Sequence, residues 1–323
     1  TQPSNAGKFQ DRFVTADGQS RASVSLSKPE TLWFNTGTQC NIECENCYIL
    51  SSPTNDALVY ITTDEVNAYL VQISERSWPI HEIGFTGGEP FMNPQMIDMA
   101  RSALSRGFEV LILTNAMRPM MRKSVREGLL DLQDEFGARM TLRVSLDHHG
   151  SDLHDAERGA GSFAKAITGM EWLRDSGIRT TVAGRAQFGV GEVDSRARFA
   201  ALFERNGFAI NAQDPAELVL FPEMDEEIEV PEITTSCWGI LGKRPQDIMC
   251  ASSRMVVRRK GADHPVVLAC TLLPYSPEFE LGQTLAEAER HARDAEVALA
   301  QGLARQASEA AETRVADAAL AAA

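Results

Sequence analysis

Six cysteines are the residues whose type and spacing could do chemistry in this chain of 323 residues. Three of them, Cys40, Cys44 and Cys47, lie within eight residues in the run CNIECENC, a Cys-x3-Cys-x2-Cys spacing. Thiolates gathered this closely suit a metal centre, either zinc or an iron–sulfur cluster. We do not expect a disulfide framework, because the chain is large, shows no export signal and would work in a reducing compartment.

The spacing distinguishes between the two kinds of metal centre. Structural zinc sites usually combine Cys-x2-Cys pairs with a fourth ligand close by. Here the spacing is three and then two, and no Cys or His follows Cys47 within thirty residues. Three cysteines leave one iron of a four-iron cluster without a protein ligand, which makes that iron reactive. The triplet therefore favours an iron–sulfur cluster, with zinc as the alternative.

The elements that must position these cysteines are predicted from hydrophobic periodicity. Short apolar runs that end in small or polar residues predict strands at 31–36, 81–86, 108–114, 141–146, 179–184 and 217–221. Amphipathic patterns between them predict helices at 63–76, 94–107, 121–137, 161–177 and 195–207, the first capped by Thr63. This alternation predicts an α/β fold with a parallel sheet. Six units suggest a partial (β/α)6 barrel, and a doubly wound open sheet is the alternative.

In parallel barrels the chemistry lies where the strands end. The first predicted strand leads into the three cysteines, and polar or small residues follow or close the others. They are Gly87, Gly88, Glu89 and Pro90 after the second strand, Asn115 after the third, Ser145 on the fourth and Arg185 after the fifth. We therefore expect these groups to collect at one rim of the barrel.

This ordered set resembles the radical S-adenosylmethionine (SAM) superfamily. CNIECENCY resembles the family's cysteine signature, including the aromatic Tyr48, and FTGGEP resembles its Gly-Gly-Glu-Pro motif. LTNA resembles the Thr-Asn-Gly element of the third strand, with Ala116 in place of the glycine. The match covers roughly residues 31–225.

The resemblance implies a cofactor set and a reaction. Cys40, Cys44 and Cys47 would hold three irons of a [4Fe–4S] cluster, and the amino and carboxylate groups of SAM would chelate the fourth. Reductive cleavage of SAM would give a 5′-deoxyadenosyl radical that abstracts hydrogen from a substrate. A reductant such as flavodoxin or ferredoxin would supply the electron. The chain would then be an oxidoreductase or maturase acting on a small molecule or a peptide.

The resemblance also implies roles for the residues at the rim. Gly87 and Gly88 would let backbone approach the amino group of SAM, and Glu89 would accept a hydrogen bond from that group or hold the loop. The remaining implied contacts are Ser145 with the ribose or carboxylate, Arg185 with the carboxylate, Tyr48 with the adenine, and Pro90 and Asn115 as parts of the same motifs.

The second cysteine set, Cys237, Cys250 and Cys270, lies in a stretch that resembles the start of SPASM/Twitch auxiliary-cluster extensions. The segments RMVVRR and PVVLAC predict a hairpin that brings Cys250 and Cys270 near each other. The three could hold a second cluster, with an open iron or with Asp263, His264 or substrate as the fourth ligand. Structural zinc and separate buried thiols are the alternatives. The later cysteines of a full SPASM extension are missing from this sequence.

These patterns divide the chain into a polar arm (1–30), a radical SAM barrel (31–230), an auxiliary-cluster region (231–285) and an Ala-rich helical tail (286–323). Within the barrel, His148, His149 and His154 follow the fourth strand. We interpret these histidines as a substrate contact or a solvated loop, with a metal site as the less favoured alternative.

Composition limits the function classes. There are 31 Lys and Arg against 45 Asp and Glu, a net charge of −14, which argues against nucleic acid as a partner. No apolar run approaches the roughly 20 residues that span a bilayer, so we expect a cytoplasmic protein. A non-catalytic iron–sulfur carrier and a zinc-stabilised binding module are the competing functions, and the Gly-Gly-Glu-Pro motif disfavours a carrier, which needs no sulfonium site.

Overall fold

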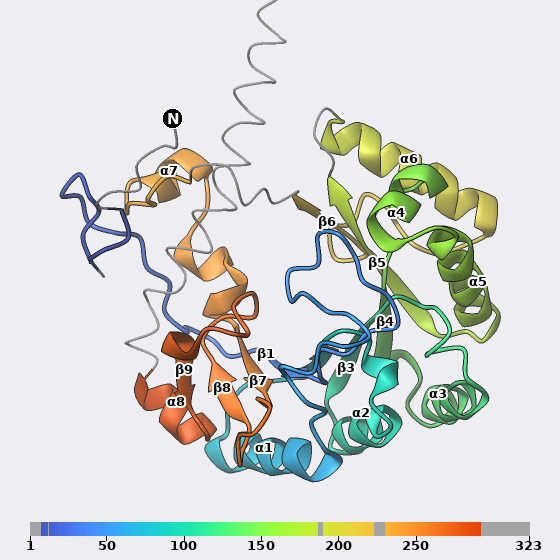
Figure 1. Cartoon of the computed structure of the whole chain (residues 1–323), viewed down its shortest axis with the longest axis horizontal. Coiled ribbons are helices and arrows are strands. Elements are labelled where there is room, and N and C mark those ends of the chain that lie inside the picture. Colours follow the sequence, from blue (N-terminus) through green and yellow to red (C-terminus); the bar gives the residue numbers. More distant parts are fainter. Residues whose placement is uncertain (1–7, 12, 187–189, 223–229, 292–323) are drawn as a thin grey trace, which may run out of the picture.

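A computed structural model describes residues 8–11, 13–186, 190–222 and 230–291. Its centre is one nine-stranded sheet with the strand order β6-β5-β4-β3-β2-β1-β7-β8-β9, which curves without closing (Figure 1). Six strands match the predicted runs: β1 (Thr31–Asn35), β2 (Glu82–Thr86), β3 (Glu109–Thr114), β4 (Met140–Ser145), β5 (Arg179–Ala186) and β6 (Leu218–Pro222). Neighbours among these six are parallel, so the partial barrel predicted from the sequence is confirmed.

The predicted hairpin also forms, but it belongs to the same sheet. Strand β7 (Ser253–Val257) pairs in parallel with β1, with Thr31 opposite Ser253, and is a seventh parallel strand. Strands β8 (Val266–Leu268) and β9 (Glu280–Gly282) continue the sheet in antiparallel pairing. The two cysteine-bearing parts of the chain therefore share one backbone hydrogen-bond network.

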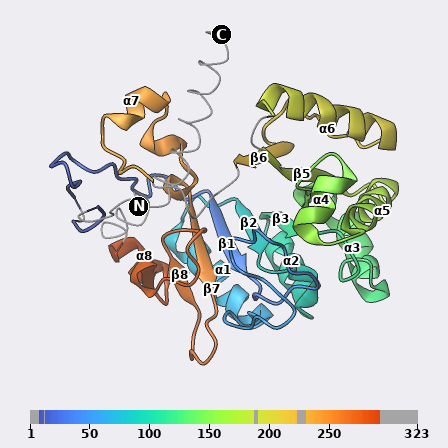
Figure 2. The ribbon, with the colours of Figure 1, turned by 45° about the horizontal axis from the view of Figure 1, so that its top comes forward.

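Most of the helices cover the outer face of the sheet, whereas the short α7 lies apart from it, near the segment before β1 (Figures 1 and 2). The helices are α1 (Thr63–Arg76), α2 (Met96–Ser105), α3 (Lys123–Phe136), α4 (Ser151–Arg158), α5 (Ser162–Asp175), α6 (Glu192–Asn206), α7 (Cys237–Leu241) and α8 (Leu285–His291). The predicted cap of the first helix was wrong by one residue. Thr62 is the N-cap, because its side chain accepts the Glu65 N–H while the Glu65 carboxylate accepts the Thr62 N–H.

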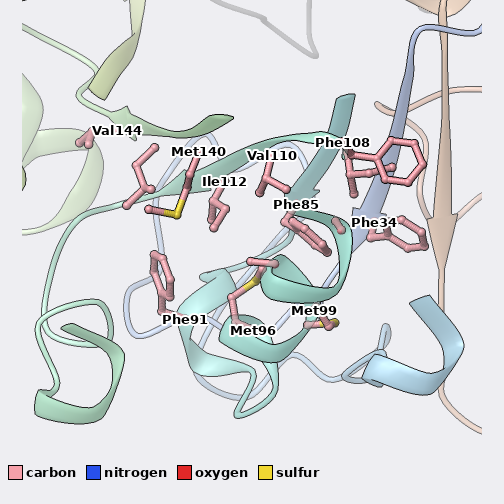
Figure 3. Packing of buried hydrophobic residues seen from close by; sticks show 14 of the residues in the cluster. Phe34, Phe85, Phe91, Met96, Met99, Phe108, Val110, Ile112, Met140 and Val144 are labelled. Atoms are coloured by element: carbon pink, nitrogen blue, oxygen red, sulfur yellow. The ribbon is translucent and has the colours of Figure 1, made fainter. Parts of the chain in front are cut away.

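The main core lies between the sheet and these helices (Figure 3). Phe34 of β1 and Phe85 of β2 stack with ring centroids 5.8 Å apart, and both side chains are fully buried. On the side of α2 that faces this core, the side chains of Met96 and Met99 are buried. This packing fixes the strand ends, where the polar residues of the rim begin.

The segment before β1 lies against the region after β6. Arg21 forms a buried ion pair with Glu232, and the Ala22 N–H donates to the Ile233 carbonyl. Val24 packs against Cys250 and Cys270. Most of the expected Ala-rich tail lies outside the described residues, which end with α8. In the part of the chain that is described, no helix is long and apolar enough to cross a membrane.

Candidate active site

An open pocket of about 670 Å³, counting the solvent at its mouth, lies at the carboxyl ends of the parallel strands. Most of the residues predicted for the rim line it: Cys40, Cys44, Cys47, Tyr48, Gly87, Gly88, Asn115, Ser145 and Arg185. Glu89 and Pro90 are not among the lining residues.

Gly87 and Gly88 are packed tightly against the segment that leads to Cys40. A Cβ atom on Gly88 would lie 2.3 Å from the Gln39 carbonyl oxygen, and Gly87 has φ +144°. The Gly88 N–H donates to the Gly37 carbonyl (2.9 Å), and the Glu89 N–H donates to the Gln39 carbonyl (3.1 Å). The glycines are therefore needed for close contact between two backbone segments, which is a reason that does not depend on any ligand.

Glu89 is buried behind the pocket and holds the loop. Its carboxylate accepts the Thr114 hydroxyl (2.9 Å), the Asn115 N–H (2.8 Å) and the Phe91 N–H (3.2 Å). Burial raises the pKa of Glu89 to about 7, and these three hydrogen bonds oppose that rise. Of the two implied roles, the structure supports the positional one. Pro90 begins a buried 3-10 turn, Pro90–Met92, for which Glu89 is the cap.

Asn115 connects the end of β3 to the cysteine segment. Its side-chain amide donates to the Asn41 side chain (2.9 Å) and lies 3.8 Å from the Cys40 sulfur. The next residue, Ala116, has φ +56°, a conformation that favours glycine. The alanine that departs from the family pattern therefore keeps the backbone shape that a glycine would adopt there.

Arg158 is a pocket residue that the sequence analysis missed. Its guanidinium donates twice to Asp147, at 2.6 and 3.0 Å, and Arg185 lies 3.5 Å from the same carboxylate. Burial alone would raise the pKa of Asp147, but the two guanidinium groups outweigh it and lower that pKa. Burial opposes the charge of Arg158, yet Asp147 holds the pKa of Arg158 above its usual value. Two cations thus share one carboxylate at the pocket.

Arg158 was missed because α4 was not predicted. This helix is only eight residues long, and its single fully buried side chain is His154. The Glu45 N–H donates to the Glu157 carbonyl (3.0 Å), and the Asn46 amide donates to the Glu157 carboxylate (3.0 and 3.1 Å). Arg185 also donates to the Asn46 carbonyl (2.6 Å). The segment between Cys44 and Cys47 is therefore held by α4 and β5.

Of the three histidines, His148 and His149 are half-buried in the loop before α4, whereas His154 does not lie in a solvated loop, one of the two interpretations made from the sequence. His154 has 0% exposure, packs edge-to-face on Phe163 at 5.6 Å, and neither ring nitrogen has a partner. Burial lowers the pKa of His154 to about 4. His148 and His149 lie against each other with ring centroids 3.8 Å apart. From the sequence, the histidines were interpreted as polar residues, whereas the packing against Phe163 makes His154 a core residue.

The donor set of the first triplet fits an iron–sulfur cluster. Burial raises the pKa of Cys40 to about 12 and also raises that of Cys44, so thiolates here need a nearby cation. Across the described residues, no three Cys, His, Asp or Glu side chains converge on a single metal ion. A cluster does not need that convergence, because each thiolate binds a different iron. Three thiols on the wall of one open pocket suit that kind of binding.

The second cysteine set is brought together in part. Cys250 and Cys270 lie in one buried cluster with Val24 and Ala251, while Cys237 packs with Ala22 and Ile233. The side chain of Trp238 contacts both clusters. The Tyr275 hydroxyl, five residues after Cys270, donates to the carbonyl of Ile49, next to the first triplet.

Comparison with known proteins places this site in a family. The model described as "Radical SAM superfamily" matches residues 34–198, which is half of the chain. The Bacillus subtilis protein AlbA, described as an antilisterial bacteriocin subtilosin biosynthesis protein, is 30% identical over 46% of this chain and 32% of its own length. The mycofactocin maturase MftC of Mycobacterium ulcerans is 27% identical over 56% of this chain and 46% of its own length.

Solved structures share the fold. Streptococcus suis SuiB bound to S-adenosylmethionine superimposes with TM-score 0.55 at 13% identity, covering 79% of this chain and 63% of SuiB. The protein anSMEcpe with bound AdoMet gives TM-score 0.56 at 16% identity, covering 84% of each chain. The chain spans about a third to a half of the curated relatives described above. With the family model covering half of its residues, the chain belongs to the radical SAM superfamily.

Proposed function

We propose that this chain binds a [4Fe–4S] cluster through Cys40, Cys44 and Cys47 and uses it with SAM to modify a peptide. The observation that supports this proposal most strongly is that all three cysteines line one pocket, together with polar residues at the ends of β3, β4 and β5. When bound, the reduced cluster and SAM supply a radical that takes a hydrogen atom from the substrate. The radical SAM family uses both groups.

The residues of this chain would bind and orient SAM. Arg158 and Arg185 share the single carboxylate of Asp147, so this wall of the pocket keeps one positive charge for the carboxylate of SAM. Ser145, at the end of β4, would offer a hydroxyl to the same ligand, and Tyr48 an aromatic face to its adenine. Gly88 and Asn115 would fix the cysteine segment against the strand ends.

Named relatives support the choice of a peptide substrate. SuiB has been solved bound to the precursor peptide SuiA, and anSMEcpe with a peptide named Kp18Cys. AlbA takes part in making the bacteriocin subtilosin. AdoMet-dependent heme synthases are also similar to this chain, with 27% identity for the Methanosarcina barkeri protein. A porphyrin is therefore the small-molecule alternative.

We assign residues 231–285 to a second cluster. Cys250 and Cys270 lie together in a buried cluster at the β7–β8 hairpin, and Cys237 would join them as a third ligand. A second cluster suits a net oxidation, because a substrate radical must give up an electron; this rests on analogy. The physiological reductant would be a flavodoxin or ferredoxin.

The test is SAM cleavage by anaerobically reconstituted protein. With dithionite, we expect 5′-deoxyadenosine and methionine to form, and we expect a Cys40/Cys44/Cys47→Ala variant to form neither. That variant should also lose about four irons per chain, the content of one cluster. Iron content that is equal in both proteins, together with no SAM turnover, would contradict the proposal and leave a non-catalytic iron–sulfur carrier or a zinc module.

The substrate class is tested separately. Hydrogen transfer from a deuterated substrate into 5′-deoxyadenosine identifies the molecule that loses hydrogen. Precursor peptides should give label transfer, and iron-coproporphyrin should give none. The reverse result would replace the peptide with the small-molecule alternative while leaving the SAM chemistry intact.

A further inference from the structure

Arg254, on β7, is a buried cation without a carboxylate partner. It is 2% exposed, and one terminal nitrogen donates to the carbonyls of Cys250 and Ser253, both at 2.7 Å. Its Nε atom is buried and has no hydrogen-bond partner. Among the described residues, no carboxylate forms an ion pair with Arg254, whereas the other buried arginines, Arg21 and Arg196, each pair with a glutamate.

A buried guanidinium without an anion is costly, because the charge loses its hydration without a compensating partner. Carbonyl oxygens offset part of that cost, but they leave the net charge in place. The arrangement is therefore incomplete without a negative group beside Arg254.

The thiols nearest to this charge belong to Cys250, whose carbonyl accepts the hydrogen bond of Arg254, and to Cys270, which packs with Cys250. Both are buried, and they pack with Val24 and Ala251. The Leu272 N–H points at the Cys270 sulfur at 3.4 Å. Amide donors and a cation around a sulfur stabilise a thiolate, and hydrogen bonds of this kind tune bound clusters. Two neutral thiols, or a disulfide, would leave Arg254 uncompensated. The Cys250 and Cys270 side chains also interact with each other, so one thiolate shared by the pair would offset the charge without a metal, and the metal content measured below separates these cases.

We propose that Arg254 is the buried counter-cation of an iron–sulfur cluster bound by the thiolates of Cys250 and Cys270, and that it raises the reduction potential of that cluster. This inference rests on the second cluster of the proposed function. A fixed positive charge favours the more negative, reduced state, and net charge is one of the factors that set cluster potentials. Arg254 is thus a positioning residue that acts through the cluster.

The test isolates the second site in the full-length Cys40/Cys44/Cys47→Ala variant. In that background, Arg254→Met removes the charge and Arg254→Lys keeps it. Arg196→Met is the matched control, because Arg196 is also buried and also donates to backbone carbonyls, those of Ala212 and Leu218. Iron and sulfide per chain and the midpoint potential, followed by electron paramagnetic resonance, are measured on anaerobic protein.

We expect Arg254→Met to lose the cluster or to shift its midpoint to more negative potential, while Arg254→Lys and Arg196→Met keep the parent values. An unchanged potential with full iron content in Arg254→Met would overturn the inference. A second site that binds zinc or no metal would overturn it as well. SAM cleavage by a Cys250/Cys270→Ala variant, in which the first triplet is intact, shows separately whether the radical site is functional.

Discussion

At the scale of single residues, the site depends on side chains that position backbone as much as on those that could touch a ligand. Glu89 belongs to the motif that points to SAM, yet its three hydrogen bonds fix Thr114, Asn115 and Phe91. The sequence supplied the identity of these residues but left two roles open for Glu89. The loop contacts of Glu89 become visible only in the packed structure, because burial and partners depend on strands far apart in the chain.

Gly88→Ala should disturb the cysteine segment without adding any polar group. The new Cβ would lie 2.3 Å from the Gln39 carbonyl oxygen, which is backbone and cannot rotate away. We expect a loss of about 1–3 kcal/mol in the free energy of unfolding and a several-fold drop in bound iron. Gly191→Ala is the control, because nothing lies within 4 Å of its Cβ position. Equal iron content in the two variants would contradict the explanation that Gly88 is needed for close contact with the cysteine segment.

His154 should make the protein acid-sensitive. Its pKa is about 4 when folded, against about 6.5 in an unfolded chain. Between these values the unfolded state binds a proton that the folded state does not, so stability falls as pH falls from 6.5 to 4. The full effect is about 3 kcal/mol. We expect His154→Leu to flatten this part of the urea-denaturation profile relative to wild type, and the exposed-site variant His264→Gln to leave it unchanged.

At the scale of elements, the long strands and helices were predictable and the short helix was not. The six apolar runs have a period and composition that reveal buried parallel strands. Helix α4 has eight residues, and every side chain except His154 is exposed or half-buried, so its sequence resembles a polar loop. Its two inward-pointing residues are His154 and Arg158. Their roles depend on contacts with Phe163 and Asp147, which lie outside the helix.

Helix α4 should contribute to the site through Asn46 and Glu157. Replacing either with Ala removes the contacts at 3.0 and 3.1 Å that hold the segment between Cys44 and Cys47. Because the pair is exposed, we expect less than about 1 kcal/mol of lost stability. SAM cleavage should nevertheless fall several-fold. In a double-mutant cycle the two losses should not add, whereas Lys123→Ala, in an exposed pair on α3, should change neither quantity.

At the scale of the whole molecule, the region after residue 231, which was predicted as a small extension, continues the sheet beyond β1. Its hairpin was predictable from two β segments and a turn, which are local signals. The pairing of β7 with β1 was not, because it joins residues more than 200 positions apart and leaves no local pattern. Because of this pairing, Cys250 lies near the end of the sheet at which β1 begins. Cys40 follows the opposite end, at which β1 stops.

One continuous sheet should unfold as one unit. Val256 of β7 is fully buried, lies opposite Phe34 of β1, and belongs to the main core. Val256→Ala should cost about 2 kcal/mol. Because β1 and β7 share hydrogen bonds, slow-exchanging amides in both strands, measured by hydrogen exchange, should lose the same protection. Val193→Ala, at an exposed site on α6, should change neither strand. If protection fell in β7–β9 while β1 and β2 kept theirs, the extension would be an independent unit, and a cluster held there could be lost without disturbing the radical site.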